Sequence, residues 1–326
     1  MSRALLPLTP LYAAAVAAKN LAYDRGWARA EQLRGLVISV GNLSVGGSGK
    51  TPLTIRLAEL LRDQGIAVDV LSRGYGRGSD ATAKVDANGS AEQFGDEPLL
   101  IARAGIPVFV GDSRYEAGLL AEREAGSPRV HLLDDGFQHR QLAREADIVV
   151  LHRNDFADRL LPAGRLRETF HALDRAHFVV LREEDRDLEA ELRRRGCDLP
   201  VWWMRRTVVL PEARRVVAFC AVARPQEFFA EVRRQGCDIL EARVWRDHHA
   251  WTADDVAVLA ALAQRYGADA TLTTEKDWVR LRPEQRQTLE AAAPLRAARL
   301  TVNLADEPAI LDAVLARLGA ASAMRK

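Results

Sequence analysis

The sequence predicts an α/β protein with three parts: a P-loop NTPase-like domain with a mainly parallel sheet, a second, smaller α/β domain, and an N-terminal interfacial helix. Short apolar runs alternate with helical patterns along the first half of the chain. A glycine-rich loop follows the first apolar run, and a similar alternation begins again after residue 207. Helices between short apolar strands require crossover connections, which favour a parallel sheet covered on both faces.

The elements of the first half follow from apolar runs of strand length that are separated by amphipathic stretches. Residues 53–62 and 114–125 have helical patterns. Ligand-binding loops of such sheets lie at the carboxyl ends of the strands, so we expect a site there. The predicted strands are residues 37–40, 67–71, 108–110, 130–133, 148–151 and 178–181.

The second half begins with two extended stretches, at residues 201–204 and 207–210, which Pro211 ends. The elements predicted after them are strands at 216–220, 239–242, 270–273 and 300–304, and helices at 225–235, 253–266 and 308–318. The predicted organisation is a membrane-contacting helix at 1–30, a phosphate-loop domain at 31–207 and a smaller α/β domain at 208–326.

The composition is that of an ordinary globular protein, with 48% hydrophobic and 28% charged residues among 326. The formal net charge is only +1, which gives no overall case for nucleic-acid binding. The cysteines Cys197, Cys220 and Cys237 are widely spaced. They predict neither a metal site nor a disulfide framework, and they favour a reducing cytosol.

A phosphate-binding loop is predicted at residues 44–51, Ser-Val-Gly-Gly-Ser-Gly-Lys-Thr, between the first strand and the first helix. Glycines let backbone N–H groups close around an anion, and the helix N-terminus adds partial positive charge. Lys50 can reach the β- and γ-phosphates of a nucleoside triphosphate, and Thr51 can hold Mg²⁺. The usual pattern has glycine where this chain has Ser44, and a plain glycine-rich turn is the alternative. The residues predicted to bind nucleotide are Ser44, Val45, Gly46, Gly47, Ser48, Gly49, Lys50 and Thr51.

The first thirty residues carry an apolar segment that is too short to span a bilayer. Residues 4–18 contain no charge and are interrupted by Pro7 and Pro10, whereas a span needs about 20 apolar residues. The segment also resembles a secretion signal, but a nucleotide site that begins at Ser44 favours the cytosol. Basic and aromatic residues around an apolar helix suit the membrane–water interface, and a helix packed on its own domain is the alternative. The basic residues are Arg3, Lys19, Arg25 and Arg29.

Two aspartates, Asp134 and Asp135, end the predicted strand at 130–133. Adjacent acids at the end of a buried strand are the arrangement in which a carboxylate holds Mg²⁺ beside a phosphate loop. Two neighbouring aspartates repel each other unless a cation lies near, and the alternative is a strand followed by an Asp-Gly turn. Gln138 and His139 are polar groups of the same loop.

Polar residues also gather in further loops. Arg73 and Arg77 lie on a glycine-containing loop after the second strand, and arginines there suit phosphate contact. Asp96 precedes a helix, where an aspartate is also an ordinary N-terminal cap. His248 follows an acid in a loop and is a candidate for acid–base chemistry. Basic and acidic residues also occur together at 161–168 and at 273–277.

Together these motifs resemble the tetraacyldisaccharide 4′-kinases, the lipid A kinases that phosphorylate the 4′-hydroxyl of a lipid A precursor at the inner membrane. The resemblance covers nearly the whole chain, and residues 41–52 match the family's phosphate loop, including Ser or Thr in place of the first glycine. Two positions depart from the family pattern, because Arg165 stands at a usual proline and Ala221 at a usual glycine. The other matching motifs are at 71–76, 95–98, 134–139, 161–168, 247–248 and 274–277.

The resemblance implies an ATP- and Mg²⁺-dependent kinase that converts a tetraacyldisaccharide 1-phosphate into lipid IVA as a peripheral protein at the cytoplasmic face of the inner membrane. In this reading residues 31–207 are the kinase domain, residues 208–326 close over its active site, and the helix at 1–30 contacts lipid. Asp96 with His248 polarises the acceptor hydroxyl. Lys50 and Arg167 steady the transferring phosphoryl group. The residues implied around Mg²⁺ are Thr51, Asp134, Asp135 and Glu168, and further site residues are Arg73, Gln138 and His139.

Two other readings remain. One is a P-loop kinase or synthetase that acts on a small soluble substrate. The other is a nucleotide-switched binding protein, such as a metal-insertion GTPase. The second needs a guanine-reading motif, and the nearest string, residues 274–277, lacks the intervening residue.

Overall fold

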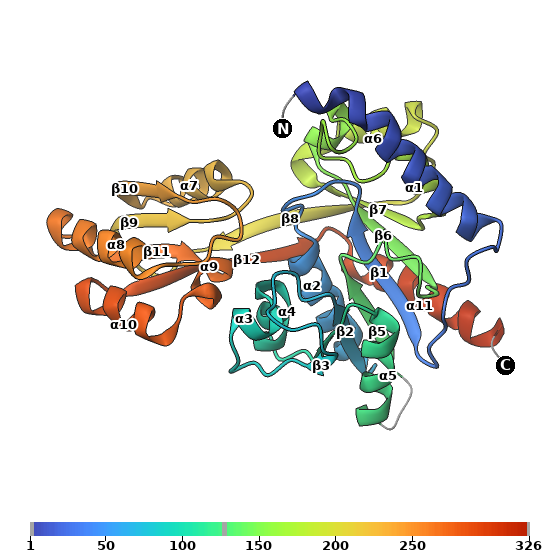
Figure 1. Cartoon of the computed structure of the whole chain (residues 1–326), viewed down its shortest axis with the longest axis horizontal. Coiled ribbons are helices and arrows are strands. Elements are labelled where there is room, and N and C mark those ends of the chain that lie inside the picture. Colours follow the sequence, from blue (N-terminus) through green and yellow to red (C-terminus); the bar gives the residue numbers. More distant parts are fainter. Residues whose placement is uncertain (1–2, 126–128, 325–326) are drawn as a thin grey trace.

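A computed structural model describes residues 3–125 and 129–324, without the side chains of residues 3 and 4. The predicted surface role of the Arg3 side chain therefore lies outside the described residues. Two lobes are joined by two long strands, β8 (Val201–Val209) and β12 (Leu295–Leu304) (Figure 1). Within the described ranges, the strands are hydrogen-bonded in the order β10-β9-β11-β12-β8-β7-β6-β1-β5-β2-β4-β3. The predicted α/β class with a mainly parallel sheet is confirmed.

The first lobe is built around a sheet whose strands, apart from the short β3 (Ala83–Lys84), are largely buried beneath helices. Its strands are β1 (Leu36–Asn42), β2 (Val68–Ser72), β3 (Ala83–Lys84), β4 (Val108–Val110), β5 (Val130–Asp134), β6 (Ala146–Val150) and β7 (Phe178–Arg182). Its helices are η1 (Arg3–Leu8), α1 (Thr9–Asp24), α2 (Lys50–Asp63), α3 (Ala91–Phe94), α4 (Asp96–Arg103), α5 (Arg114–Ala125), η2 (Arg153–Ala157), η3 (Phe170–Arg175), η4 (Glu183–Asp185) and α6 (Leu188–Arg194).

Strand β1 lies at the centre of this lobe, in parallel register between β5 and β6. Val40 pairs with Asp134, so the carboxyl ends of β1 and β5 lie at the same edge of the sheet. Helix α2 packs on β1, β2 and β5 directly after the phosphate loop. The loop and the paired aspartates are therefore neighbours in space although they are far apart in the sequence.

The second lobe repeats the α/β plan on a smaller scale, with its strands parallel to one another. Helices α8 and α10 pack together on one face of its sheet, and α7 packs on the other. Its elements are β9 (Arg215–Cys220), α7 (Pro225–Arg234), β10 (Asp238–Val244), α8 (Ala253–Tyr266), β11 (Ala270–Thr274), α9 (Glu275–Arg280) and α10 (Pro283–Ala292).

The connection between the lobes is an antiparallel ribbon of β8 and β12, so the predicted boundary at 207/208 falls inside a strand. The last helix, α11 (Glu307–Met324), packs on α2, β1 and β6 and so lies with the first lobe. Strand β12 is longer than the predicted 300–304, because Arg296 and Arg299 interrupt the apolar pattern of its first half. Helix α10 was not predicted.

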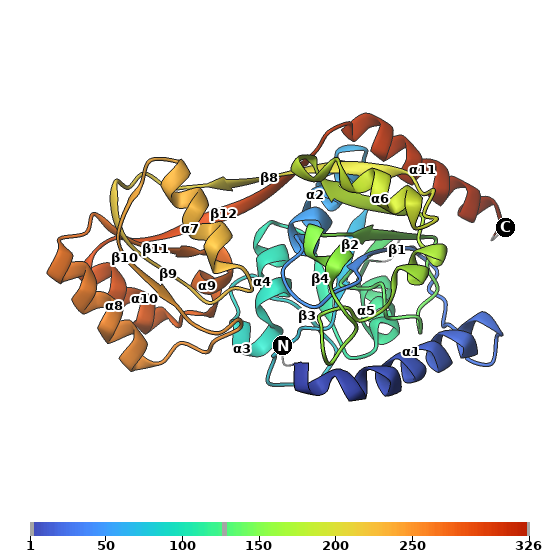
Figure 2. The same ribbon diagram turned by 90° about the horizontal axis from the view of Figure 1, so that it is seen from above.

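The N-terminal helix α1 lies along the first lobe, on the opposite side from α11 (Figure 2). It buries no residue among those described and contacts the lobe through polar groups, including the Tyr12 hydroxyl, which donates to the Arg167 carbonyl at 3.0 Å. No helix within residues 3–125 or 129–324 combines the length and apolar character that crossing a membrane needs. The exposed leucines of η1 and α1 are Leu5, Leu6, Leu8, Leu11 and Leu21.

The packing of α11 on the first lobe predicts a stability effect far from the predicted site. Ile310 is 4% exposed in the core that α11 shares with α2 and β1. Ile310→Ala should lower the free energy of unfolding by about 2–5 kcal/mol, because it removes buried methyl groups and leaves a cavity. Urea denaturation measures this, with Val258→Ala on an exposed position of α8 as the control. Equal effects of the two variants would contradict the docking of α11.

Candidate active site

The phosphate loop connects β1 to α2 and depends on two glycines with left-handed backbone. Gly46 has φ of 110° and Gly49 has φ of 93°, which residues with a Cβ rarely adopt. Ser44, at the place of the missing first glycine, instead bridges to Leu166, and the Val45 amide donates to the Arg165 carbonyl at 2.9 Å. The loop at 159–168 therefore braces the phosphate loop from outside.

Lys50, Thr51, Asp134 and Asp135 converge where β1 and β5 end. The Thr51 hydroxyl donates to Asp134 Oδ2 at 3.0 Å, and Lys50 Nζ lies 3.5 Å from Asp135 Oδ1. Asn42, the last residue of β1, accepts a hydrogen bond from Lys50 Nζ at 3.1 Å. We did not predict a role for Asn42; the available signal was a polar residue at the end of an otherwise apolar strand.

The two aspartates have opposite electrostatic environments. Burial, with Glu97 and Asp135 as neighbouring acids, raises the pKa of Asp134 to about 7 despite the nearby Lys50. Burial alone would also raise the pKa of Asp135, but Lys50 and Arg167 outweigh it and hold that pKa below its usual range. Asp135 also has a positive φ of 55°. Protein cations thus compensate the charge of Asp135, whereas the charge of Asp134 is not compensated in this way.

Arg167 completes the cation pair around Asp135. Its guanidinium donates to both carboxylate oxygens, at 3.0 and 2.7 Å, and also to Asn42 Oδ1. The structure thus brings Lys50 and Arg167 together at the head of the phosphate loop. Two cations at this position can compensate the negative charge of a bound phosphate group.

Asp96 and His248 meet across the two lobes. His248 Nδ1 lies 3.1 Å from Asp96 Oδ2, and His248 has a positive φ of 59° in the loop before α8. Burial alone would raise the pKa of Asp96, but Lys276, His248 and Arg280 outweigh it and lower that pKa to about 2. Asp96 is therefore a buried carboxylate that keeps its charge.

Two cations of α9 hold this pair, and we did not predict roles for them. Arg280 Nε lies 3.3 Å from Asp96 Oδ2, and Lys276 Nζ lies 3.2 Å from both Glu97 Oε1 and His248 Nε2. Because a lysine ammonium only donates, His248 Nε2 accepts this hydrogen bond, which places the ring proton on Nδ1, the nitrogen that faces Asp96 Oδ2. Lys276 lies in the motif at 273–277, whereas Arg280, one helical turn later, had no signal of its own.

Other predicted residues lie apart from these groups or serve as supports. The Glu168 carboxylate binds Arg175 at 2.7 Å and Asn20 of α1 at 2.9 Å, so its partners are not Thr51 or the aspartates. Arg73 remains largely exposed, with its Nε 3.8 Å from Asp112 Oδ1. Gln138 Nε2 donates to the Asn42 carbonyl at 3.0 Å. Burial and nearby guanidinium groups lower the pKa of His139 to about 3, so its ring is neutral.

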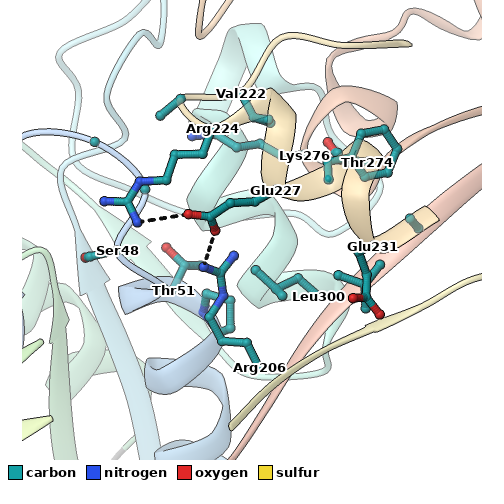
Figure 3. Close-up of a pocket in the computed structure, with 18 of the residues that line it drawn as sticks. Ser48, Thr51, Arg206, Val222, Arg224, Glu227, Glu231, Thr274, Lys276 and Leu300 are labelled. Atoms are coloured by element: carbon teal, nitrogen blue, oxygen red, sulfur yellow. Dashed lines mark hydrogen bonds and ion pairs between the residues drawn. The ribbon is translucent and has the colours of Figure 1, made fainter. Parts of the chain in front are cut away.

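A cavity of about 500 Å³ lies between the lobes and extends from the phosphate loop. Glu97, Asp247 and Lys276, which neighbour or contact the Asp96–His248 pair, line it as well. Figure 3 shows its wall between the phosphate loop, α7 and β12. The lining mixes charged and apolar side chains, and the apolar ones include Val208, Val222, Phe228, Ala298 and Leu300. The cavity therefore offers cations and backbone amides of the phosphate loop to an anionic group, beside apolar wall residues.

Comparison with known proteins places this site in a family. The family sequence model described as "Tetraacyldisaccharide-1-P 4'-kinase" matches residues 1–319. Proteins named tetraacyldisaccharide 4′-kinase from Koribacter versatilis and Geobacter metallireducens are 45% and 37% identical. The alignments cover 95% of this chain in both cases, and 97% and 96% of those proteins.

Among solved structures, a protein of this family also has a similar fold. The LpxK of Aquifex aeolicus, described as an "apo" form in complex with ATP, is 32% identical with a TM-score of 0.77. The match covers 97% of this chain and 98% of that one. On the family model, the relatives and the shared fold, the chain belongs to the tetraacyldisaccharide 4′-kinase family and is a kinase.

Proposed function

We propose that this enzyme transfers the γ-phosphate of ATP to the 4′-hydroxyl of a tetraacyldisaccharide 1-phosphate, giving lipid IVA, in lipid A biosynthesis. The observation that carries the proposal is that the cavity lined by the phosphate loop is also lined by Glu97, Asp247 and Lys276, which neighbour or contact the Asp96–His248 pair, in a member of this family. A phosphate donor and an acceptor hydroxyl can meet there.

The residues of the loop suit the phosphates of ATP. Helix α2 begins at Lys50, so its first amides face the loop with partial positive charge. The Ser48 hydroxyl is buried without a hydrogen-bond partner in the described part of the chain, which leaves a donor for an anion. Lys50 and Arg167 add two cations at the same place.

The residues also suit Mg²⁺ bound through phosphate. Within the described ranges no three His, Cys, Asp or Glu side chains are placed to hold an ion by themselves. Mg²⁺ on a nucleotide typically needs only one or two protein oxygens, because phosphates and waters supply the rest. The Thr51 hydroxyl and the uncompensated Asp134 carboxylate are such oxygens. Bound there, Mg²⁺ would neutralise charge on the β- and γ-phosphates.

Asp135 and Glu168 have less direct roles in this proposal. Asp135 holds Lys50 and Arg167 in position. If Asp135 also bound the metal, the metal would compete with these two cations for its carboxylate oxygens. Each Glu168 oxygen already accepts a hydrogen bond, one from Asn20 and one from Arg175, and neither partner belongs to the Thr51–Asp134 group. We therefore assign Thr51 and Asp134 as the first candidates for ligands, with Asp135 next to them.

The Asp96–His248 pair orients the acceptor hydroxyl and accepts its proton. Asp96 is a weak base because its pKa is lowered to about 2. Phosphoryl transfer tolerates this, since the transition state is loose and the hydroxyl proton leaves late. The pair exists only where the lobes meet, so closure of the cleft assembles the acceptor side of the site.

An assay with two acceptors tests the proposed function. Phosphate transfer from labelled ATP is measured to a tetraacyldisaccharide 1-phosphate in mixed micelles and to the deacylated disaccharide phosphate in solution. We expect transfer to the lipid and little to the soluble sugar, with Lys50→Ala as the inactive control. Equal use of the soluble acceptor would favour a P-loop kinase for small substrates.

The proposed pair predicts non-additive kinetics. Asp96→Ala and His248→Ala should each lower kcat by roughly 10²-fold or more, and the double variant should lose much less than the product. Steady-state assays with the lipid acceptor measure this, with the exposed Asp198→Ala as the control. Multiplicative losses would show that the two residues act separately.

The raised pKa of Asp134 predicts a pH-dependent stability change. The folded-state pKa is about 7, whereas an unfolded aspartate has a pKa of about 3.9. The nucleotide-free protein therefore loses stability as the pH rises from about 4 to 7, because the buried carboxyl must ionise. Asp134→Asn should be more stable than the natural protein at pH 8 and should lose that advantage at pH 5. It should also lose the extra thermal stabilisation that Mg²⁺ adds to ATP.

Thermal denaturation at the two pH values, with and without Mg²⁺ and ATP, measures both effects. Asp198→Asn, which changes an exposed aspartate, is the matched control. A variant that is destabilised at pH 8 in the absence of nucleotide would contradict the uncompensated charge of Asp134.

We propose further that η1 and α1 rest on the cytoplasmic face of the inner membrane without crossing it. Their leucines are exposed, whereas Tyr12 and Asn20 on the same helix contact the first lobe. Arg25 and Arg29 are exposed beside them, but Lys19 donates to the Gln138 carbonyl. An apolar face with basic residues at its end suits the surface of an anionic membrane.

This proposal predicts that leucine substitutions separate lipid contact from nucleotide chemistry. Leu8→Gln with Leu11→Gln should reduce sedimentation with anionic liposomes and raise the KM for lipid several-fold, with little change in the KM for ATP. Deletion of the helix is a poorer test, because Asn20 and Tyr12 hold the loop of Arg167 and Glu168. Val258→Gln, an exposed change on α8, is the control. Unchanged liposome binding would show that the helix is only part of the scaffold.

A further inference from the structure

The Glu227 carboxylate, on α7 of the second lobe, collects three guanidinium groups. Its oxygens lie 3.0 Å from Arg182, 3.0 Å from Arg206 and 3.5 Å from Arg224. His152 Nε2 is 3.7 Å away. None of these residues takes part in the phosphoryl-transfer chemistry described above.

This cluster borders the phosphate loop. A Cβ on Gly49 would lie 3.8 Å from the Arg206 Cδ, and a Cβ on Gly46 would lie 3.7 Å from the Cβ of Ala223, the neighbour of Arg224. Figure 3 shows Arg206 and Arg224 pointing toward Glu227 beside Ser48 and Thr51. All four cluster residues other than His152 line the same cavity as the loop.

The cluster has more positive than negative charge. Burial alone would raise the pKa of Glu227, but His152, Arg182 and Arg206 hold it below its usual range. Burial and neighbouring arginines lower the pKa values of Arg206 and Arg224 even though Glu227 opposes this. Arg206 Nε is buried with no hydrogen-bond partner in the described residues. The arginines could therefore accept more negative charge than one carboxylate supplies.

We propose that Glu227 is an internal substitute for the nucleotide's phosphates: it holds Arg206 and Arg224 beside the phosphate loop in the empty enzyme and releases them when ATP binds. Arg206 and Arg224 are then positioning residues for the triphosphate, and Glu227 is a competing anion. This inference rests on the proposed ATP dependence, but not on the identity of the acceptor.

The positions of the residues around Glu227 show which arginines can pass to phosphate and which can stay paired with Glu227. Arg182 and His152 belong to the first lobe and Glu227 to the second, so these contacts cross the cleft. Arg206 lies on the β8 ribbon, and Arg224 immediately precedes α7. Transfer of Arg206 and Arg224 to phosphate leaves Glu227 paired with Arg182 and His152, which keeps α7 over the loop.

Direct binding of ATP tests the competition without any phosphoryl transfer. Isothermal titration with ATP in the absence of acceptor gives the Kd of the natural protein, Glu227→Gln, Arg224→Gln and the double variant. Glu227→Gln should tighten binding by about three- to tenfold, as expected for removal of one partly screened charge contact. Arg224→Gln should weaken binding, and by a larger factor when Glu227 is already Gln.

Glu191→Gln is the matched control, because Glu191 on α6 also pairs with two arginines, at 2.7 Å each, outside the cavity. It should leave the Kd unchanged. Thermal denaturation reports folding: Glu227→Gln should have a lower Tm without nucleotide and a larger upward shift with ATP.

Weaker or unchanged ATP binding by Glu227→Gln would overturn the proposal and leave Glu227 as a clamp between the lobes. Failure of the kinase proposal gives a different result. ATP binding that responds to Glu227 without phosphate transfer to the lipid would contradict the acceptor and leave this inference standing. Absence of ATP binding by the natural protein would overturn both.

Discussion

The parallel pairing of β1 with β5 is the constraint on which the rest of the site depends. Parallel strands end at the same edge of a sheet, so a loop after one and acids after the other become neighbours without any further device. The register Val40 to Asp134 sets Thr51 and Asp134 at hydrogen-bond distance. Lys50 and Arg167 then balance Asp135, and Asp134 remains the carboxylate without a cation of its own. The site for a metal–phosphate pair therefore follows from strand order.

The second lobe contributes charged side chains to the site. Their ion pairs with the first lobe are also the contacts that hold the two lobes together at the cleft. On one side α9 brings Lys276 and Arg280 to Asp96, and His248 joins them from the loop before α8. On the other side Glu227 reaches Arg182 of β7. Both groups of contacts cross between lobes, and both border the cavity that holds the phosphate loop. Desolvated charges of this kind are costly unless paired, and these contacts between the lobes give each buried charge a partner.

The sequence predicted most strands and the positions of the glycine-rich loop between β1 and α2 and of the two aspartates at the end of β5, because those features are local or periodic. It could not predict which distant loops meet. Asn42 lies in the phosphate-loop motif, yet its contact with Arg167 depends on how the 161–168 loop folds back on β1. Glu168 was expected at the metal from the family resemblance, but Arg175 and Asn20 occupy its oxygens, and no periodicity indicates those partners. The sequence also could not predict that α11 packs on the first lobe, since the apolar pattern of a helix does not indicate which sheet the helix covers.

The N-terminal helix links the surface of the molecule to this site by a short series of contacts. Asn20 and Tyr12 hold the loop that carries Glu168 and Arg167, and Arg167 in turn holds Asp135 and the end of β1. The same helix buries no side chain and presents leucines to the outside. A helix without a buried residue gains little from its own packing, and polar contacts exposed to water are worth little. Covering its leucines would remove that weakness, so an apolar surface outside the protein would stabilise the helix together with the loop that positions Arg167.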